Sequence, residues 1–76
     1  MNEAYVMLNI DYKRKNDIIE KAKNIPIVKA VKTVYGIYDV LIALESDDVQ
    51  KIKKAIDVDL HSIEGINNIT VLIAID

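Results

Sequence analysis

The chain has 76 residues, a formal net charge of -2, no cysteine and a single histidine, His61. This length fits one domain over residues 1–76, and the net negative charge argues against direct binding of nucleic acid. The Cys and His counts exclude disulfides and thiolate or multi-histidine metal sites, so we expect no cofactor. No apolar run is long enough to span a bilayer and the N-terminus lacks a basic signal region, so we expect a cytoplasmic protein without membrane contact.

The first expected element is a strand over residues 3–10, followed by a short helix over residues 15–24. Alternation in the strand places Ala4, Val6, Leu8 and Ile10 on one face and Tyr5, Met7 and Asn9 on the other. In the helix, Asn16 or Asp17 is expected to cap the start, and Pro26 prevents the chain from continuing as a helix.

Two further strands are expected over residues 28–35 and 38–45, joined by a tight turn at Gly36. Glycine takes positive φ at little cost, so a lone glycine between two β-prone runs indicates a hairpin. The valines of the first of these strands recur at a spacing of three, which predicts a bulge or an edge position. The second strand is apolar on both faces, which is typical of a strand covered on both sides.

A second helix is expected over residues 49–63, because its apolar residues recur at three- and four-residue steps. Asp47, with Gln50 three residues later, is expected to cap its start, and Gly65 to end it. The last strand covers residues 66–75, with Ile69, Val71, Ile73 and Ile75 on one face and Asn68, Thr70, Leu72 and Ala74 on the other.

The predicted order is β-α-β-β-α-β, with a weak internal repeat in which residues 25–31 match residues 63–69 in their apolar positions. Both features favour an α+β fold of the ferredoxin-like type, a four-stranded antiparallel sheet with two helices on one face.

Two helices cover only one face of such a sheet, and the other face would be largely apolar. It would carry Tyr5, Met7, Asn9, Leu41, Ala43, Thr70, Leu72 and Ala74. Contiguous apolar patches usually mark an interface, and closed two-fold interfaces are the commonest kind. We therefore predict a homodimer that packs sheet against sheet, an assignment that a one-residue slip in strand phase would invert.

Few side chains suggest chemistry. His61 has no nucleophile or second ligand beside it in the sequence, and a surface or capping role near the end of the second helix is expected. Asp39 stands out because it follows the Gly36 turn in the most apolar strand. It is either a solvated acid at the hairpin, or an acceptor for a ligand amino group beside backbone N–H groups that receive a carboxylate.

Three short motifs, in this order, resemble the effector domain of the Lrp/AsnC (feast/famine) regulators, also called the RAM domain. They are Ile25-Pro26-Ile27-Val28, Tyr35-Gly36-Ile37-Tyr38-Asp39 and Ile63-Glu64-Gly65-Ile66, against the family patterns I-P-x-V, G-x-Y-D and I-x-G-V. Glu64-Gly65 departs from the Pro-Gly that family members often have. The resemblance spans essentially the whole chain, which looks like a stand-alone effector domain without the helix-turn-helix of full-length members.

The resemblance implies homodimers formed sheet to sheet, often four dimers closing into an octamer, with amino acid effectors bound between dimers near the hairpin. Matched by position, the ligand-binding residues would be Gly36, Tyr38 and Asp39, with Ile37 and Tyr35 beside them and Thr70 as a weaker candidate. It implies a regulatory module rather than an enzyme, which modulates transcription by assembling with itself or with full-length Lrp/AsnC regulators.

Other functions remain open at this point. An ACT-like regulatory domain shares the strand order, but it usually has glycine between the first strand and first helix, where residues 11–15 have none. A ligand-free oligomerisation module would assemble identically with and without amino acids. A small ferredoxin-like enzyme is disfavoured by the lack of Cys and of a second His, and an RNA-binding sheet by the lack of paired aromatics.

Overall fold

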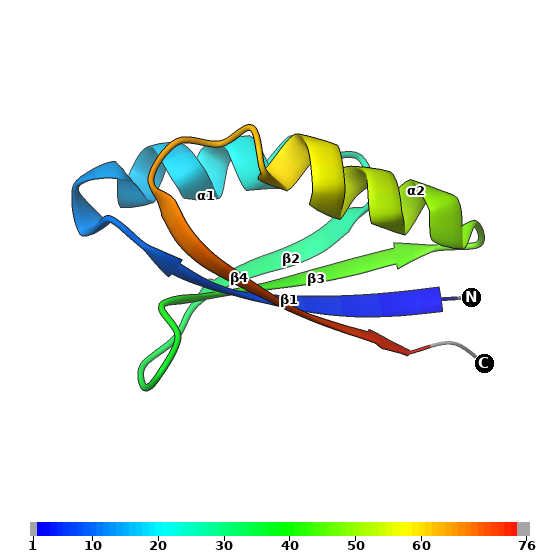
Figure 1. Ribbon diagram of the computed structural model, residues 1–76, viewed down its shortest axis with the longest axis horizontal. Coiled ribbons are helices and arrows are strands. Elements are labelled where there is room, and N and C mark those ends of the chain that lie inside the picture. The colour runs from blue at the N-terminus through cyan, green and yellow to red at the C-terminus, as the bar shows by residue number, and fades with distance from the viewer. Residues whose placement is uncertain (1, 75–76) are drawn as a thin grey trace.

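The computed structural model describes residues 2–74 and has the predicted order of elements (Figure 1). The strands are β1 (Asn2–Ile10), β2 (Val28–Thr33), β3 (Val40–Ser46) and β4 (Ile66–Ala74), and the helices are α1 (Lys15–Lys23) and α2 (Val49–Lys54). A 3-10 turn, Tyr12–Arg14, leads into α1, and a π-helix, Ala55–Leu60, continues α2. Ile75, expected on the last strand, lies outside the described residues. Within residues 2–74, no helix has the length and apolar character needed to cross a membrane.

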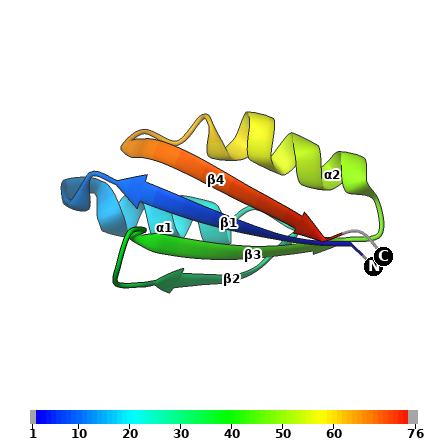
Figure 2. The ribbon, with the colours of Figure 1, turned by 60° about the horizontal axis from the view of Figure 1, so that its bottom comes forward.

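The four strands form one antiparallel sheet in the order β2-β3-β1-β4, with β2 and β4 at its edges (Figure 2). Both helices lie on the same face of this sheet (Figure 1). The predicted ferredoxin-like α+β fold is therefore confirmed. The predicted edge position of β2 is confirmed, and its register against β3 shifts between Val28 and Ala30, the irregularity that a bulge would give.

The core lies between the sheet and the two helices, and the strand phase read from alternation is correct. Val6 of β1 is paired with Ile42 of β3 on one side and with Val71 of β4 on the other, and all three face the helices. The fully buried side chains of the core include Leu8, Val40, Leu44, Ile18, Ile52 and Leu60. Burial of each such aliphatic residue contributes roughly 1.5–3 kcal/mol, which holds the helices against the sheet.

The opposite face, called here the open face, carries the mixed residues predicted for it. Tyr5 is paired with Ala43 and with Leu72, and Met7 with Leu41 and Thr70. Tyr5 is 40% exposed and Leu72 is 59% exposed. In the single chain, the helices do not cover these side chains, because both helices lie on the other face (Figure 2).

The predicted caps of α1 are wrong. The 3-10 turn runs directly into the helix, so neither Asn16 nor Asp17 stands at a free helix start. Asp11 instead caps the 3-10 turn, where its carboxylate accepts a hydrogen bond from the backbone N–H of Lys13 at 3.1 Å. Asp17 pairs with Lys21 one turn later, at 3.2 Å between Oδ2 and Nζ.

The predicted ends of the second helix also need correction. Its N-cap is Asp48 rather than Asp47, and the Asp48 carboxylate accepts a hydrogen bond from the N–H of Gln50 at 2.9 Å. The helix ends at Leu60, before Ile63, and Gly65 (φ +97°) stands in the turn that leads into β4. At the helix end, the Ser62 N–H donates to the Val58 oxygen and its hydroxyl to the Asp59 oxygen, so these two carbonyls are satisfied without a glycine.

The hairpin between β2 and β3 is longer than the predicted tight turn. β2 stops at Thr33 and β3 begins at Val40, which leaves residues 34–39 as a connection, called the hairpin from here on. Its ends are closed by a hydrogen bond from the Val34 N–H to the Asp39 carbonyl at 3.0 Å. The N–H and the carboxylate of Asp39 also bind β1, as described next.

Candidate functional site

The hairpin projects from one end of the sheet, on the side away from the helices (Figure 1). At its tip, Gly36 has a φ of +129°, a conformation that favours glycine. The flanking side chains reach into solvent, since Tyr35 is fully exposed and Ile37 is 83% exposed. The tip therefore presents two large side chains, Tyr35 and Ile37, and accessible backbone to solvent.

Asp39 fastens the base of the hairpin through three hydrogen bonds, two to β1 and one to the 3-10 turn that follows it. Its backbone N–H donates to the Leu8 carbonyl at 2.8 Å. Its carboxylate accepts from the backbone N–H of Ile10 through Oδ2 and from the Tyr12 hydroxyl through Oδ1, each at 3.0 Å. The carboxylate is thus held at the end of β1, and neither oxygen is left to solvent alone.

A fourth hydrogen bond joins the tip to the same strand. The side-chain amide of Asn9 donates from Nδ2 to the Ile37 carbonyl at 2.7 Å. Asn9 occupies the last open-face position of β1, so its amide is directed to the side on which the hairpin lies. The end of β1 thereby holds both the tip and the base of the hairpin.

These contacts favour the ionised carboxylate. The hydrogen bond from the Ile10 N–H lowers the pKa of Asp39, partial desolvation opposes that effect, and the Tyr12 hydroxyl and the nearby Asn9 amide lower it further. The pKa of Tyr12 is raised, chiefly because its hydroxyl donates to Asp39. At neutral pH the site therefore presents a fixed negative charge beside the hairpin backbone.

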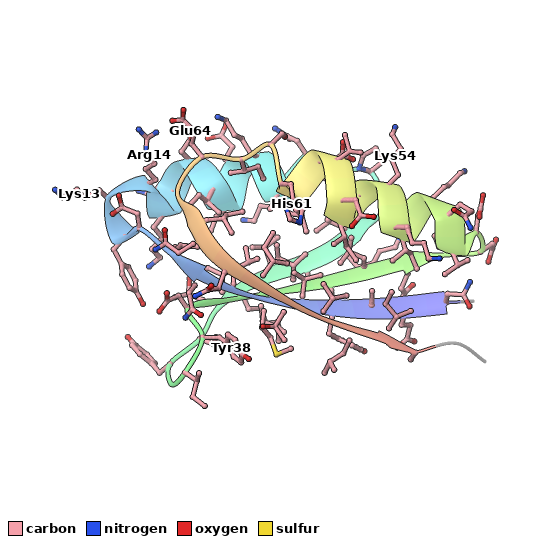
Figure 3. All side chains as sticks on the ribbon, in the orientation of Figure 1. Lys13, Arg14, Tyr38, Lys54, His61 and Glu64 are labelled. Carbon is pink, nitrogen blue, oxygen red and sulfur yellow. The ribbon has the colours of Figure 1, made fainter. Side chains whose placement is uncertain are left out.

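The structure brings five of the six predicted site residues together. Residues 35–39 are consecutive on the hairpin, and Tyr38 lies there on the side of the sheet away from the helices (Figure 3). Thr70 lies on the edge strand β4, paired with Met7, whereas the hairpin joins β2 and β3 at the other side of the sheet. Thr70 shares the open face with Asn9 but is not part of the hairpin cluster.

The residues that hold the hairpin escaped the sequence prediction. Asn9 and Tyr12 lie 28 and 27 positions from their partners Ile37 and Asp39. The only signal for Asn9 is a polar amide after the apolar Tyr5 and Met7 on the same face of the strand. Tyr12 follows the strand in what the sequence presents as an ordinary polar connection.

His61 stays apart from the hairpin. It is exposed at the end of the π-helix and borders a hollow of about 360 Å³ between that helix and β4, together with Asp57 and Asn67. Across residues 2–74, no three His, Cys, Asp or Glu side chains are grouped as a metal site would require.

The sequence matches a known family model over nearly its whole length. The model of the Lrp/AsnC ligand binding domain covers residues 3–76. A search of curated proteins finds no significant match.

Solved structures with the same fold fall into two groups by length. TTHA0845 from Thermus thermophilus superposes with a TM-score of 0.92 at 25% identity, over 100% of this chain and 95% of that one. Hypothetical protein PHS023 from Pyrococcus horikoshii gives 0.90 at 25% identity, over 99% and 90%. The transcriptional regulator NMB0573 from Neisseria meningitidis, solved as a complex with L-Met, gives 0.85 at 16% identity, over 99% of this chain but 50% of that one.

Proposed function

The chain belongs to the Lrp/AsnC ligand binding domain family, and from that membership we propose that it is a single regulatory module that binds an amino acid and is not an enzyme. The module would modulate transcription by assembling with itself or with full-length, DNA-binding Lrp/AsnC regulators in the cytoplasm. Its switch would be a difference in affinity of the ligand for different assembly states, because a ligand shifts an equilibrium only by that difference.

The observation that carries this proposal is the fixed carboxylate of Asp39 at the base of a hairpin whose tip exposes the backbone of Gly36. Each Asp39 oxygen accepts one hydrogen bond within the chain and retains further lone pairs, so the carboxylate can also receive an ammonium group. Backbone N–H groups around a glycine with positive φ suit a ligand carboxylate. An α-amino acid carries both groups on one carbon, and the relative NMB0573 was solved with L-Met.

The site as proposed is completed by other subunits. The open face would pair with a second copy to form a homodimer, which removes Leu72 and Tyr5 from solvent. The exposed Tyr35 and Ile37 at the hairpin tip would contact a neighbouring dimer, as in an octamer of four dimers. The ligand would then lie between dimers against Gly36, Tyr38 and Asp39, with Thr70 at most peripheral in the same subunit.

A thermal-shift screen of the twenty amino acids tests this function, with light scattering on the same samples to give the mass of the assembly. At a ligand concentration about 100 times Kd, binding stabilises the folded protein by about 2.7 kcal/mol, which is readily measured. We expect a selective shift in the wild type and none in Asp39→Asn. Asparagine keeps an oxygen for the Ile10 N–H but removes the negative charge and the oxygen that accepts from Tyr12. Tyr12→Phe, which removes the same Tyr12 hydrogen bond and keeps the charge, is therefore its matched control.

A second candidate is an assembly module without a ligand, which the apolar hairpin tip alone would also support. An assembly of constant mass, with no shift from any of the twenty amino acids, would favour that candidate and contradict the amino acid sensor.

A further inference from the structure

The end of β1 and the 3-10 turn that follows it hold the hairpin by four hydrogen bonds, and in two of them the group outside the hairpin is a side chain. The backbone contributes the bond from the Asp39 N–H to the Leu8 oxygen and the bond from the Ile10 N–H to the Asp39 carboxylate. Asn9 contributes the bond to the Ile37 carbonyl at 2.7 Å, and Tyr12 the bond to the Asp39 carboxylate at 3.0 Å.

Neither side chain is needed for the core. Tyr12 is 57% exposed and belongs to the 3-10 turn, and Asn9 is half-buried on the open face. Leucine or threonine would suit the open face of a strand as well as Asn9 does, and phenylalanine would pack as Tyr12 does. Compared with such replacements, Asn9 and Tyr12 each have in addition a polar group that donates a hydrogen bond to the hairpin.

We propose that Asn9 and Tyr12 are positioning residues of the ligand site, which hold the Ile37 carbonyl and the Asp39 carboxylate in the geometry that receives a ligand ammonium group. The inference rests on the proposed function for the identity of the ligand, but the claim that these two side chains order the hairpin concerns the free protein. Residues 34–39 form no strand or helix of their own. A loop ordered before binding loses less conformational freedom on binding, so the two side chains raise affinity without touching the ligand.

The experiment compares four variants of the full chain, two that remove these donors and two matched controls. Asn9→Ala and Tyr12→Phe each remove one hydrogen bond to the hairpin. Asn68→Ala removes the same amide from the residue paired with Asn9 across β1 and β4. Ser62→Ala removes a side-chain hydrogen bond of 2.7 Å, to Asp59, in the helical layer.

Two quantities are measured on every variant. The first is hydrogen exchange of the Val34 and Asp39 amides in the free protein, since these N–H groups close the hairpin and its base. The second is the concentration of a mixture of the twenty standard amino acids that gives half of the maximal thermal shift. Exchange of the β1–β3 core amides in the same sample serves as the reference, because a general loss of stability would speed exchange there as well as in the hairpin.

We expect faster exchange at Val34 and Asp39, and a half-shift concentration about three- to tenfold higher, in Asn9→Ala and Tyr12→Phe, which is the range that one lost hydrogen bond gives. The controls should match the wild type in both quantities. Unchanged exchange and unchanged half-shift concentration in both donor variants overturn the inference. If the wild type itself does not respond to the mixture, the proposed function fails, and hydrogen exchange alone tests the positioning role. Hairpin exchange that is faster in the two donor variants, and not in the controls, supports that role. Unchanged exchange refutes it.

Discussion

The carboxylate of Asp39 accepts a hydrogen bond from the backbone N–H of Ile10 at 3.0 Å, although the two residues lie 29 positions apart. The same residue donates its own N–H to the Leu8 carbonyl, so the backbone and the side chain of Asp39 are both hydrogen-bonded to the end of β1. The two interpretations of Asp39 from sequence, a hairpin acid and a ligand acceptor, are therefore compatible. The fold fixes the charge first, and the proposed ligand would meet a charge already in place.

This arrangement predicts how stability depends on pH. The Ile10 N–H, and then Tyr12 and Asn9, lower the pKa of Asp39 in the folded state below its ordinary value of 3.8. The unfolded state then binds more protons than the folded state between the two pKa values, so stability rises with pH across that window. Asp39 contributes fully only well above its ordinary pKa of 3.8, and its contribution is lost as the pH falls through the folded-state pKa.

Urea unfolding of the wild type and of Asp39→Asn, at pH values between 2 and 7, measures this dependence. The difference in unfolding free energy between the two proteins should shrink as the pH drops below about 4, where the ordinary Asp carboxyl titrates. Asp57→Asn, which removes an exposed carboxylate on the π-helix, is the control. A difference between the wild type and Asp39→Asn that stays constant over the whole range would contradict a carboxylate that the fold keeps ionised.

The start of α2 provides a second prediction, because two adjacent aspartates differ in their contacts. Asp48 accepts a hydrogen bond from the Gln50 N–H, whereas Asp47 precedes the cap and is exposed. Asp48→Ala should lower the unfolding free energy by about 1 kcal/mol, the usual effect of losing an N-cap. Asp47→Ala should change it by less than about 0.5 kcal/mol, as for most surface substitutions. Equal losses in the two variants would show that the cap is not at Asp48.

The two glycines give a third prediction. Both have positive φ, but a Cβ on Gly65 would stand 2.8 Å from Cδ and 3.0 Å from Cβ of Arg14, and 3.1 Å from Cδ1 of Ile18. A Cβ on Gly36 would meet nothing within 4 Å. Gly36→Ala therefore introduces only backbone strain, of about 1–3 kcal/mol. Gly65→Ala introduces the same strain and also a steric clash with Arg14 and Ile18 at the start of α1. Thermal unfolding should show a lower Tm for Gly65→Ala than for Gly36→Ala, and the reverse order would contradict this packing.

The sequence was sufficient for the parts of the fold that depend on repeated burial. Alternation along β1 and β4 places Val6 and Val71 toward the helices, and the spacing of Val28 and Val31 indicates the bulge, because burial acts on every residue of a strand. One apolar residue in the wrong phase would not have changed the face assignment, because the assignment depends on all residues of the strand together.

Single hydrogen bonds give no such repeated signal, and the errors concern them. The choice between Asp47 and Asp48 depends on one backbone dihedral, since Asp48 has an extended backbone (ψ 112°) that directs its carboxylate to Gln50. The length of the hairpin depends on bonds from Asp39 to Leu8 and Ile10, which lie on another strand. The candidate site was predicted as residues 35–39 with Thr70 as a weaker candidate, but the residues that hold the hairpin could be identified only once the sheet placed β1 beside β3.

The last prediction concerns the open face, and it rests on two apolar side chains of nearly equal exposure. Leu72 is 59% exposed on the open face, and Val58 is 55% exposed on the π-helix. If two sheets pack face to face, an aspartate at position 72 places an unpaired charge in that interface, which costs several kcal/mol of association free energy. An aspartate at position 58 should stay in solvent.

Light scattering after size-exclusion chromatography should therefore give a dimer or a larger assembly for the wild type and for Val58→Asp, and a lower mass for Leu72→Asp. Because Leu72 contributes little to the core of its own chain, circular dichroism of Leu72→Asp should still show a folded domain at low temperature. An unchanged mass for Leu72→Asp would place the interface elsewhere. A loss of mass in Val58→Asp alone would place the interface on the helical layer. The apolar open face would then not be explained by self-assembly.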